Sequence, residues 1–337
     1  MQASFAHSTA VRTVAFAPNG QTVVNGSTDG HFKLWKVAGR TLLKDYSAET
    51  GTGVICSAYS PDSRQIAFGR SDASFVLANN PAAPLPFDFD GDGHNDMLLQ
   101  NSLTGQIALW YMNGAGVLGG NLLSTVPLPG WSVVGSGDFN NDGYPDLVLQ
   151  NQTTGQVALW YMNNTTYLGG QVTSFAPGST YKVVGVGDFN NDGKPDLVFQ
   201  DSVTGGIVIW FMNGANVIGG VSIPFTPAPN FRVVGVGDFN ADKKADLLLQ
   251  NSNTGQLVVW YMDGSVYAGG SAITTIPGSG WLVKGVADYN NDGIPDIVFQ
   301  NSTTNQAVIW YMAGLTVTGG SVTSYTPAPN YLIVGPR

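Results

Sequence analysis

The chain has 337 residues and a formal net charge of −9, yet only 11% of its residues are charged. It contains no cluster of lysine and arginine, so the composition excludes a basic surface for nucleic acid. The single cysteine, Cys56, excludes an internal disulfide framework, and no apolar run is long enough to span a membrane. The first residues lack a basic start and an apolar core, so no signal peptide is predicted.

Residues 1–80 have their own pattern of short strands and turns. An expected strand over 11–16 ends at a Pro-Asn-Gly turn, and expected strands over 22–27 and 32–36 flank a Thr-Asp-Gly turn. This pattern resembles a WD repeat, in which a histidine, a serine or threonine, a turn aspartate and a tryptophan form a buried polar cluster. The matching residues are His7, Ser27, Asp29 and Trp35.

A second, weaker copy of this pattern follows over 54–77. Leu77 stands where the tryptophan is expected, and no histidine precedes the copy at the matching place. The next residues, 81–87, contain three prolines, each of which lacks the backbone donor that a central strand needs. We therefore expect two WD-like blades over 1–80 and a proline-rich junction over 81–87.

From Asp88 onward, one acidic loop recurs every 50 residues. Its copy at 138–146 reads Asp-Phe-Asn-Asn-Asp-Gly-Tyr-Pro-Asp, and the others begin at Asp88, Asp188, Asp238 and Asp288. Side-chain oxygens stand at positions 1, 3, 5 and 9, with glycine at position 6 to permit a tight turn. Hard oxygen ligands at this spacing favour calcium over zinc or copper. Position 7 varies freely, as expected if it offers only its backbone carbonyl.

The loops place four aspartates in the first copy and three in each of the other four, so the acidity of the chain is concentrated there. The fourth copy has Lys243 in place of the glycine and Lys244 beside it, so we expect its site to be weaker. The predicted calcium ligands are Asp88, Asp90, Asp92, His94, Asp96, Asp138, Asn140, Asp142, Tyr144, Asp146, Asp188, Asn190, Asp192, Lys194, Asp196, Asp288, Asn290, Asp292, Ile294 and Asp296, and, more weakly, Asp238, Asn240, Asp242 and Asp246.

The loops are not EF-hands, because position 12 is leucine or phenylalanine where an EF-hand needs glutamate, and a strand pattern follows instead of a helix. Each unit has four short strand patterns, which at this period are typical of a propeller blade. The units over 88–337 resemble the FG-GAP/VCBS-type repeats of integrin-like and bacterial surface propellers. That resemblance implies calcium binding, a role in protein binding or adhesion, and an extracellular or cell-surface location.

The number of blades follows from the units. Two WD-like units and five acidic-loop units predict an all-β, seven-bladed hybrid propeller of four-stranded antiparallel blades that forms one domain. The alternative is a five-bladed ring over 88–337, closed by the last strand pattern at 331–335, with the WD-like segment appended. We favour the mixed ring, because isolated WD-like blades would expose apolar faces.

Two series of aromatic residues repeat with the same period. Trp110, Trp160, Trp210, Trp260 and Trp310 stand in mid-strand among apolar neighbours, and we expect them to pack between blades. A second series follows Pro/Gly-rich loops, where ligand contacts are more frequent than on scaffold strands, although packing between blades is the stronger expectation. These candidate ligand-binding residues are Trp131, Tyr181, Phe231, Trp281 and Tyr331.

Catalysis has little support in the sequence. His7, His31, His94 and Cys56 form no spacing typical of a nucleophile and its base, and paired carboxylates occur only inside the acidic loops. Two functions remain open: a non-enzymatic scaffold for protein binding or adhesion, and a multivalent lectin that binds glycans. We expect calcium as the cofactor, a protein or glycan ligand, no nucleic-acid partner and a monomeric chain.

Overall fold

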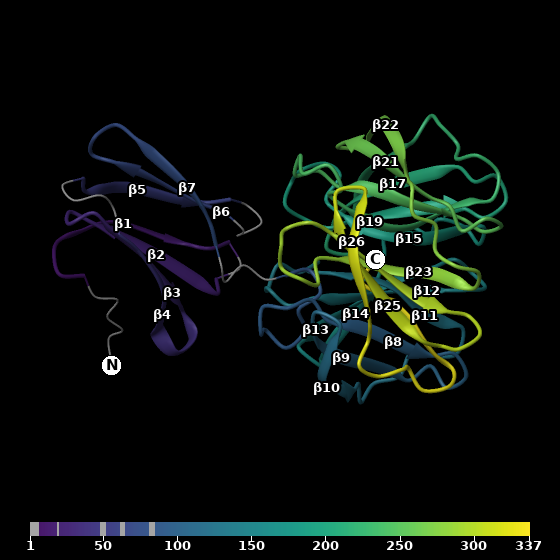
Figure 1. The fold of residues 1–337 in the computed structure, drawn as a ribbon. Helices are drawn as coiled ribbons and strands as arrows, with labels where there is room; N and C mark the ends of the chain where they lie inside the picture. The colour runs from purple at the N-terminus through teal and green to yellow at the C-terminus, as the bar shows by residue number, and fades with distance from the viewer. Residues whose placement is uncertain (1–6, 19, 48–51, 61–64, 81–84) are drawn as a thin grey trace. The chain divides into compact units, whose positions relative to one another are not determined.

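The computed structural model describes residues 7–18, 20–47, 52–60, 65–80 and 85–337, and these form an all-β protein (Figure 1). The strands make seven antiparallel sheets, six of four strands and one of three. The all-β propeller fold predicted from the repeats is therefore confirmed, with the expected number of sheets. No helix in these ranges has the length and apolarity needed to cross a membrane.

The chain divides into two compact units, which are described separately. Unit 1 comprises residues 1–84 and 141–143, and unit 2 comprises residues 85–140 and 144–337. Residues 81–84 of the predicted proline-rich junction lie outside the described residues. Its last residue, Phe87, is buried in a core cluster of unit 2, and its carbonyl accepts a hydrogen bond from the Asp96 amide at 2.8 Å. The end of the predicted junction thus belongs to the first acidic-loop repeat.

Unit 1 contains two sheets that pack on each other through β1, β2 and β5. Phe32 and Phe68 stack at its centre, with ring centroids 4.2 Å apart, and Val24, Leu34 and Ile66 are fully buried around them. The weaker second copy forms only three strands, the smaller of the two sheets. The strands are β1 (Val11–Phe16), β2 (Thr22–Ser27), β3 (His31–Lys36) and β4 (Thr41–Ser47), with a short 3-10 helix at Ala38–Arg40, and then β5 (Val54–Tyr59), β6 (Gln65–Arg70) and β7 (Phe75–Asn79).

Unit 2 contains five four-stranded sheets with the same internal order. In each, an inner strand comes first, an acidic loop follows, and three strands lead outward. The first sheet is β8 (Met97–Asn101), β9 (Ile107–Asn113) and β10 (Gly116–Leu122), joined by β27 (Tyr331–Gly335). The others are β11 (Trp131–Gly137), β12 (Asp146–Asn151), β13 (Val157–Asn163) and β14 (Thr166–Val172); β15 (Tyr181–Gly187), β16 (Asp196–Asp201), β17 (Ile207–Asn213) and β18 (Asn216–Ser222); β19 (Phe231–Gly237), β20 (Asp246–Asn251), β21 (Leu257–Asp263) and β22 (Val266–Ile273); and β23 (Trp281–Ala287), β24 (Asp296–Asn301), β25 (Ala307–Ala313) and β26 (Thr316–Val322).

The inner strands of unit 2 contact one another in a closed cycle, β11 to β15, β19, β23, β27 and back to β11. The last strand, β27, pairs with β8 from the start of the unit, as Tyr331 with Asn101 and Ile333 with Leu99. Five sheets therefore complete a ring without residues 1–84. This corrects the closure that we favoured: the ring closes as in the five-bladed alternative, because β27 fills the position that a WD-like blade would have needed.

A buried glutamine joins each sheet of the ring to the next. The Gln100 side-chain carbonyl accepts a hydrogen bond from the Val133 amide of the neighbouring sheet at 2.9 Å, and the same contact recurs from Gln150, Gln200 and Gln250 at 3.0 Å. Gln300 closes the series by accepting from the Ile333 amide of β27 at 2.9 Å. Because buried backbone donors are costly to leave unpaired, this cycle of contacts stabilises the closed ring.

Candidate functional site

The acidic loops all connect an inner strand position to the second strand of a sheet, so they lie at corresponding ends of the five sheets. Neighbouring loops touch where the ring closes. The Asn95 side chain donates to the Asp288 carbonyl at 2.7 Å, and the Asn291 side chain donates to the Gly93 carbonyl at 3.3 Å. The sequence repeat is therefore also a spatial repeat of the same loop.

The aspartate at position 1 organises the turn of its loop. In the first copy, one oxygen of Asp88 accepts from the Gly91 amide at 2.7 Å and the other from the Gly93 amide at 2.9 Å. Asp188 and Asp288 each accept from the position 6 amide at 2.8 Å. Such turns hold the backbone folded around a group of oxygens that face the loop centre.

Two positions of each loop have left-handed backbone angles, although the sequence reasoning identified only position 6. Position 4 is left-handed as well, with φ between 58° and 78°, and is occupied by Gly91, Asn141, Asn191, Ala241 and Asn291. Glycine and asparagine tolerate this conformation best. The repeated Gly or Asn at position 4 was the signal that could have predicted it.

The aspartate at position 9 is fully buried in all five loops and holds two backbone amides. One oxygen of Asp196 accepts from the Phe189 amide at 3.0 Å, and the other accepts from the Met212 amide at 2.9 Å. The same pair of contacts is made by Asp96, Asp146, Asp246 and Asp296. This side chain therefore ties the start of the loop to the third strand of its sheet.

Burial shifts the titration of these carboxyls. It raises the pKa of Asp96 to about 8 and that of Asp196 to about 7, because the charged form is desolvated. The backbone amides oppose the shift, while the charges of Asp88 and Asp90 add to it at Asp96. The pKa values of Asp246 and Asp296 rise to about 6 for the same main reason. A cation in the loop would favour the ionised carboxylates.

The donor set of the first loop fits a calcium ion. Oxygens of Asp88, Asp90 and Asp96 lie within 4.8 Å of one another, close enough for all three to reach one ion at the roughly 2.3–2.6 Å typical of calcium. Among the described residues this is the one such group of three or more acidic, histidine or cysteine donors. Asp92 lies outside it and accepts from the His94 amide at 2.9 Å. In the other four loops position 3 is asparagine, so their third donor would be an amide oxygen.

The fourth loop departs from the others as its sequence predicts. Lys243 occupies the left-handed position 6 with φ 67°, and Ala241 occupies position 4 with φ 61°. The cation of Lys244 is 2.6 Å from Asp263 and so is held by a carboxylate outside the loop. Lys194, at the same position in the third loop, likewise donates to the Asn213 side chain at 2.9 Å. The backbone at 241 and 243 therefore distinguishes the fourth loop more than Lys244 does.

The two aromatic series lie in different surroundings. Trp131, Tyr181, Phe231, Trp281 and Tyr331 are half-buried and pack against the core clusters between sheets. The mid-strand tryptophans are also half-buried, and two of them, Trp110 and Trp210, line grooves at the ring surface. Tyr331 is the one member of the first series that lines either groove. Ligand contact by the other four stays a prediction.

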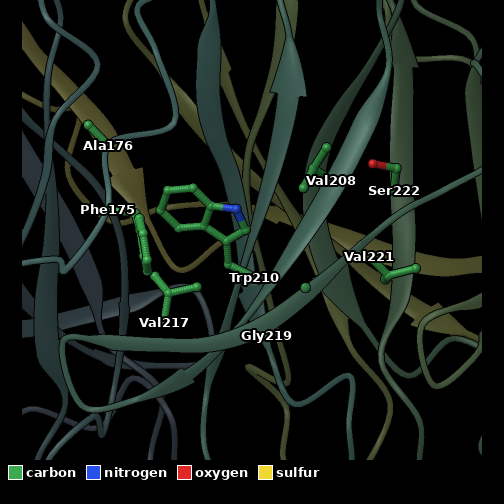
Figure 2. A pocket seen from close by; sticks show the side chains of 9 residues that line it. Phe175, Ala176, Val208, Trp210, Val217, Gly219, Val221 and Ser222 are labelled. Carbon is green, nitrogen blue, oxygen red and sulfur yellow. The ribbon is translucent and has the colours of Figure 1, made fainter.

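The two grooves are equivalent places in two sheets. The Trp210 groove, of about 440 Å³, lies between the loop that carries Phe175 and strands β17 and β18. Figure 2 shows the Trp210 indole beside Phe175 and Val217, with Val208 and Ser222 across from them. The Trp110 groove, of about 500 Å³, is formed in the same way by Tyr325, Val117 and Tyr331. The sequence reasoning missed both loop aromatics, Phe175 and Tyr325.

Gly119-Gly120 and its equivalents, expected at the start of the third strand, lie within it. Gly120 pairs with Trp110 across the strands, and Gly220 pairs with Trp210. A Cβ on Gly120 would lie 2.3 Å from the Leu109 carbonyl and 3.3 Å from the indole, so no larger residue fits. The glycine pair was a sequence signal for a close approach of backbone to tryptophan.

The predicted WD cluster of unit 1 divides into two parts. Ser27 donates to Asp29, which also accepts from Ser8 at 2.6 Å. His7 and Trp35 do not join them but meet at Asn25, whose side-chain oxygen lies 2.9 Å from a ring nitrogen of each. The sequence reasoning missed Asn25. These contacts stabilise the first sheet and contain no arrangement for catalysis.

Comparisons with known proteins agree with both repeat types. The model of the FG-GAP-like repeat matches residues 88–149, 138–199 and 238–299, which together cover more than half of the chain. The model of the WD domain, G-beta repeat, matches residues 1–36. No curated protein matches the chain.

Similar solved structures include propellers of low sequence identity. The computationally designed Ika8 protein is 15% identical, with a TM-score of 0.32, and the match covers 94% of this chain and 87% of that one. The Dos1 propeller is 11% identical, with a TM-score of 0.31 and coverage of 93% and 71%. The Cps50 (Swd1) propeller domain of Myceliophteria thermophila is 9% identical, with a TM-score of 0.30 and coverage of 94% and 86%.

Proposed function

Because the chain belongs to the FG-GAP-like repeat family, we propose that it is a non-enzymatic β-propeller scaffold for protein binding or adhesion, stabilised by calcium in its acidic loops. The observation that carries the proposal is the first loop, where Asp88, Asp90 and Asp96 bring carboxylate oxygens within 4.8 Å of one another. Such a group is destabilising without a cation and stabilising with one. We also propose a monomeric chain that works outside the cell or at its surface.

Calcium is proposed as a structural ion because the loops offer it ligands but no substrate position. Position 9 links each loop to the third strand of its sheet, so an ion bound there would stabilise the whole sheet. An ion that binds only the folded loop adds about 3 kcal/mol of stability per site at a hundredfold excess over its dissociation constant. Clustered acidic groups elsewhere, which an enzyme would use, are absent from the described residues.

Melting the protein in calcium and in chelator tests the calcium part of this function. We expect chelator to lower the melting temperature of unit 2 by about 10 °C, and calcium added back to restore it. Magnesium is the control, because its demand for octahedral geometry makes it a poor substitute. An unchanged melting temperature in chelator would contradict the proposal.

A lectin is the second candidate, because the Trp110 groove has three aromatic walls, Trp110, Tyr325 and Tyr331, on which a sugar ring could stack. A glycan array with the calcium-loaded protein distinguishes the two functions. Saturable binding to one family of glycans would favour the lectin, whereas no glycan binding would favour the protein-binding scaffold.

A further inference from the structure

We propose that the grooves at Trp110 and Trp210 each bind a tyrosine side chain of a partner protein. This inference rests on the proposed protein-binding function and gives the chemistry that the partner presents. It comes from a comparison of the five copies of one place in the ring, two of which are already filled by a tyrosine of the chain itself.

The place is defined by the mid-strand tryptophan and the glycine opposite it. In every copy the glycine leaves the indole without a neighbouring side chain across the strands, as at Trp160 with Gly170 and Trp210 with Gly220. An aromatic face beside a glycine backbone is a surface on which another ring can pack. The residue seven positions after the tryptophan decides whether the chain itself supplies that ring.

In two copies that residue is tyrosine, and its ring fills the place. Tyr167 packs against Trp160 with ring centroids 4.8 Å apart at 54°, and Tyr267 packs against Trp260 at 4.8 Å and 57°. The phenol oxygen of Tyr167 lies over Gly170, 3.1 Å from where a Cβ would be. The two rings thus share one geometry, and it is set by the tryptophan and the glycine.

In the copies with grooves that residue is valine, and the same space is open. Val117 and Val217 stand where Tyr167 and Tyr267 stand, and the grooves are lined by the glycine pairs Gly119-Gly120 and Gly219-Gly220. Gly119 and Gly219 are exposed, whereas Gly169 and Gly269 are half-covered in the tyrosine copies. The structure therefore shows the same site with and without its ring.

A second aromatic wall makes the two open grooves suited to a ring from outside. Phe175 is 62% exposed and Tyr325 is 63% exposed, although each faces a tryptophan across the groove. In the third copy with this wall, Phe225 contacts the internal Tyr267 with ring centroids 5.1 Å apart. The remaining valine copy, at Trp310, has Thr275 in place of the wall.

The lining of the Trp210 groove favours a tyrosine over a sugar. Its nine residues include one polar side chain, that of Ser222, together with two aromatic and several aliphatic side chains. A sugar would leave most of its hydroxyl groups without partners there, and unpaired polar groups cost binding energy. A phenol has one hydroxyl and a ring that stacks, as Tyr167 and Tyr267 do.

The test titrates the calcium-loaded full chain with the peptide acetyl-Gly-Tyr-Gly-amide and counts sites by calorimetry and saturation-transfer NMR. We expect saturable binding at two sites, and at least tenfold weaker binding of the leucine peptide and of methyl glycosides. The variant Val117→Tyr/Val217→Tyr supplies internal rings already tolerated at Tyr167 and Tyr267, and we expect it to abolish binding. Tyr267→Val opens a groove walled by Trp260 and Phe225, and we expect a third site.

Three results would overturn the proposal: no tyrosine peptide binding, unchanged binding by the double tyrosine variant, or tighter binding of a methyl glycoside at these grooves. Tyr267→Val keeps the test decisive if the double variant does not fold, because an unchanged number of sites would also overturn it. The chelator experiment involves no peptide, so failure of calcium stabilisation and failure of tyrosine binding are distinguishable.

Discussion

Units 1 and 2 are both built from antiparallel sheets, but they hold those sheets together differently. In unit 1 the buried polar contacts join side chains of one sheet, as where His7 and Trp35 meet at Asn25. In unit 2 the repeated contacts run from side chains to the backbone, and glutamines such as Gln100 link each sheet to the next around a closed ring. The comparison teaches that an array with identical contacts in every copy can be completed by its own last strand.

Removing that strand should have the largest effect on the comparison. A chain that stops before Ala328 lacks β27, which pairs with β8 and contacts the inner strands β11 and β23. We expect unit 2 to lose its cooperative thermal transition, because the ring is opened and β8 becomes an unpaired edge. Circular dichroism during heating measures this.

The matched control removes the other end of the chain. A protein that begins at Leu85 retains every sheet of the ring, so we expect it to stay soluble, to melt cooperatively and to bind calcium as the full chain does. If this shortened chain does not fold, the ring depends on residues 1–84 and the five-sheet closure does not explain its stability.

Lys284 interrupts the regularity of unit 2, since the other inner strands have Val134, Val184, Val234 and Val334 at this position. Burial, and then the nearby Arg337, lower the pKa of Lys284 to about 8. Lys284→Val should raise the free energy of unfolding by about 2 kcal/mol at pH 7, because it removes a charge that the fold disfavours.

The pH dependence of that gain follows from the lowered pKa. Below pH 8 both the folded and unfolded states carry the Lys284 charge, so its cost is fully present. As the pH rises from about 8 towards the ordinary value of 10.5, the unfolded state holds more protons, the cost disappears and the advantage of the valine should vanish. Urea unfolding of both proteins at pH 7 and pH 10 measures it. Lys284→Arg keeps the charge, and equal stabilisation by this variant would refute the explanation.

Lys243 marks the smallest expected effect, a departure of one loop from the other four. Its left-handed φ of 67° is unfavourable for a residue with a side chain, so Lys243→Gly should stabilise the calcium-free protein by about 1 kcal/mol. Gly293→Lys, the reciprocal change in the fifth loop, should destabilise it by a similar amount. Guanidinium unfolding in chelator measures both, and a destabilising Lys243→Gly would contradict this account of the fourth loop.

The sequence predicted the repeated features of unit 2 well, because period, loop spacing and strand patterns are local properties. The strands after each loop and the role of β27 as an inner strand in the five-bladed alternative could be read in this way. The choice between the two closures could not, since it depends on whether β27 or a WD-like blade meets β8. That contact joins residues from opposite ends of unit 2.

The candidate site was predictable in its donors but not in its hydrogen bonds. The spacing of Asp88, Asp90 and Asp96 indicated a shared centre, which the structure shows. The role of position 9 in holding two amides, one of them 16 residues away at Met112, has no signature in the loop itself. The grooves were missed for a similar reason, because Phe175 and Trp210 belong to different repeats and meet only in the folded ring.

Calcium titration by calorimetry, starting from chelator-treated protein, tests the central claim most directly. The account predicts four sites in the unmodified protein, at the first, second, third and fifth loops, and a fifth site in Lys243→Gly, where glycine restores the turn. Absence of heat on calcium addition, with the loops already ordered in the calcium-free protein, would contradict the claim that these loops are calcium sites.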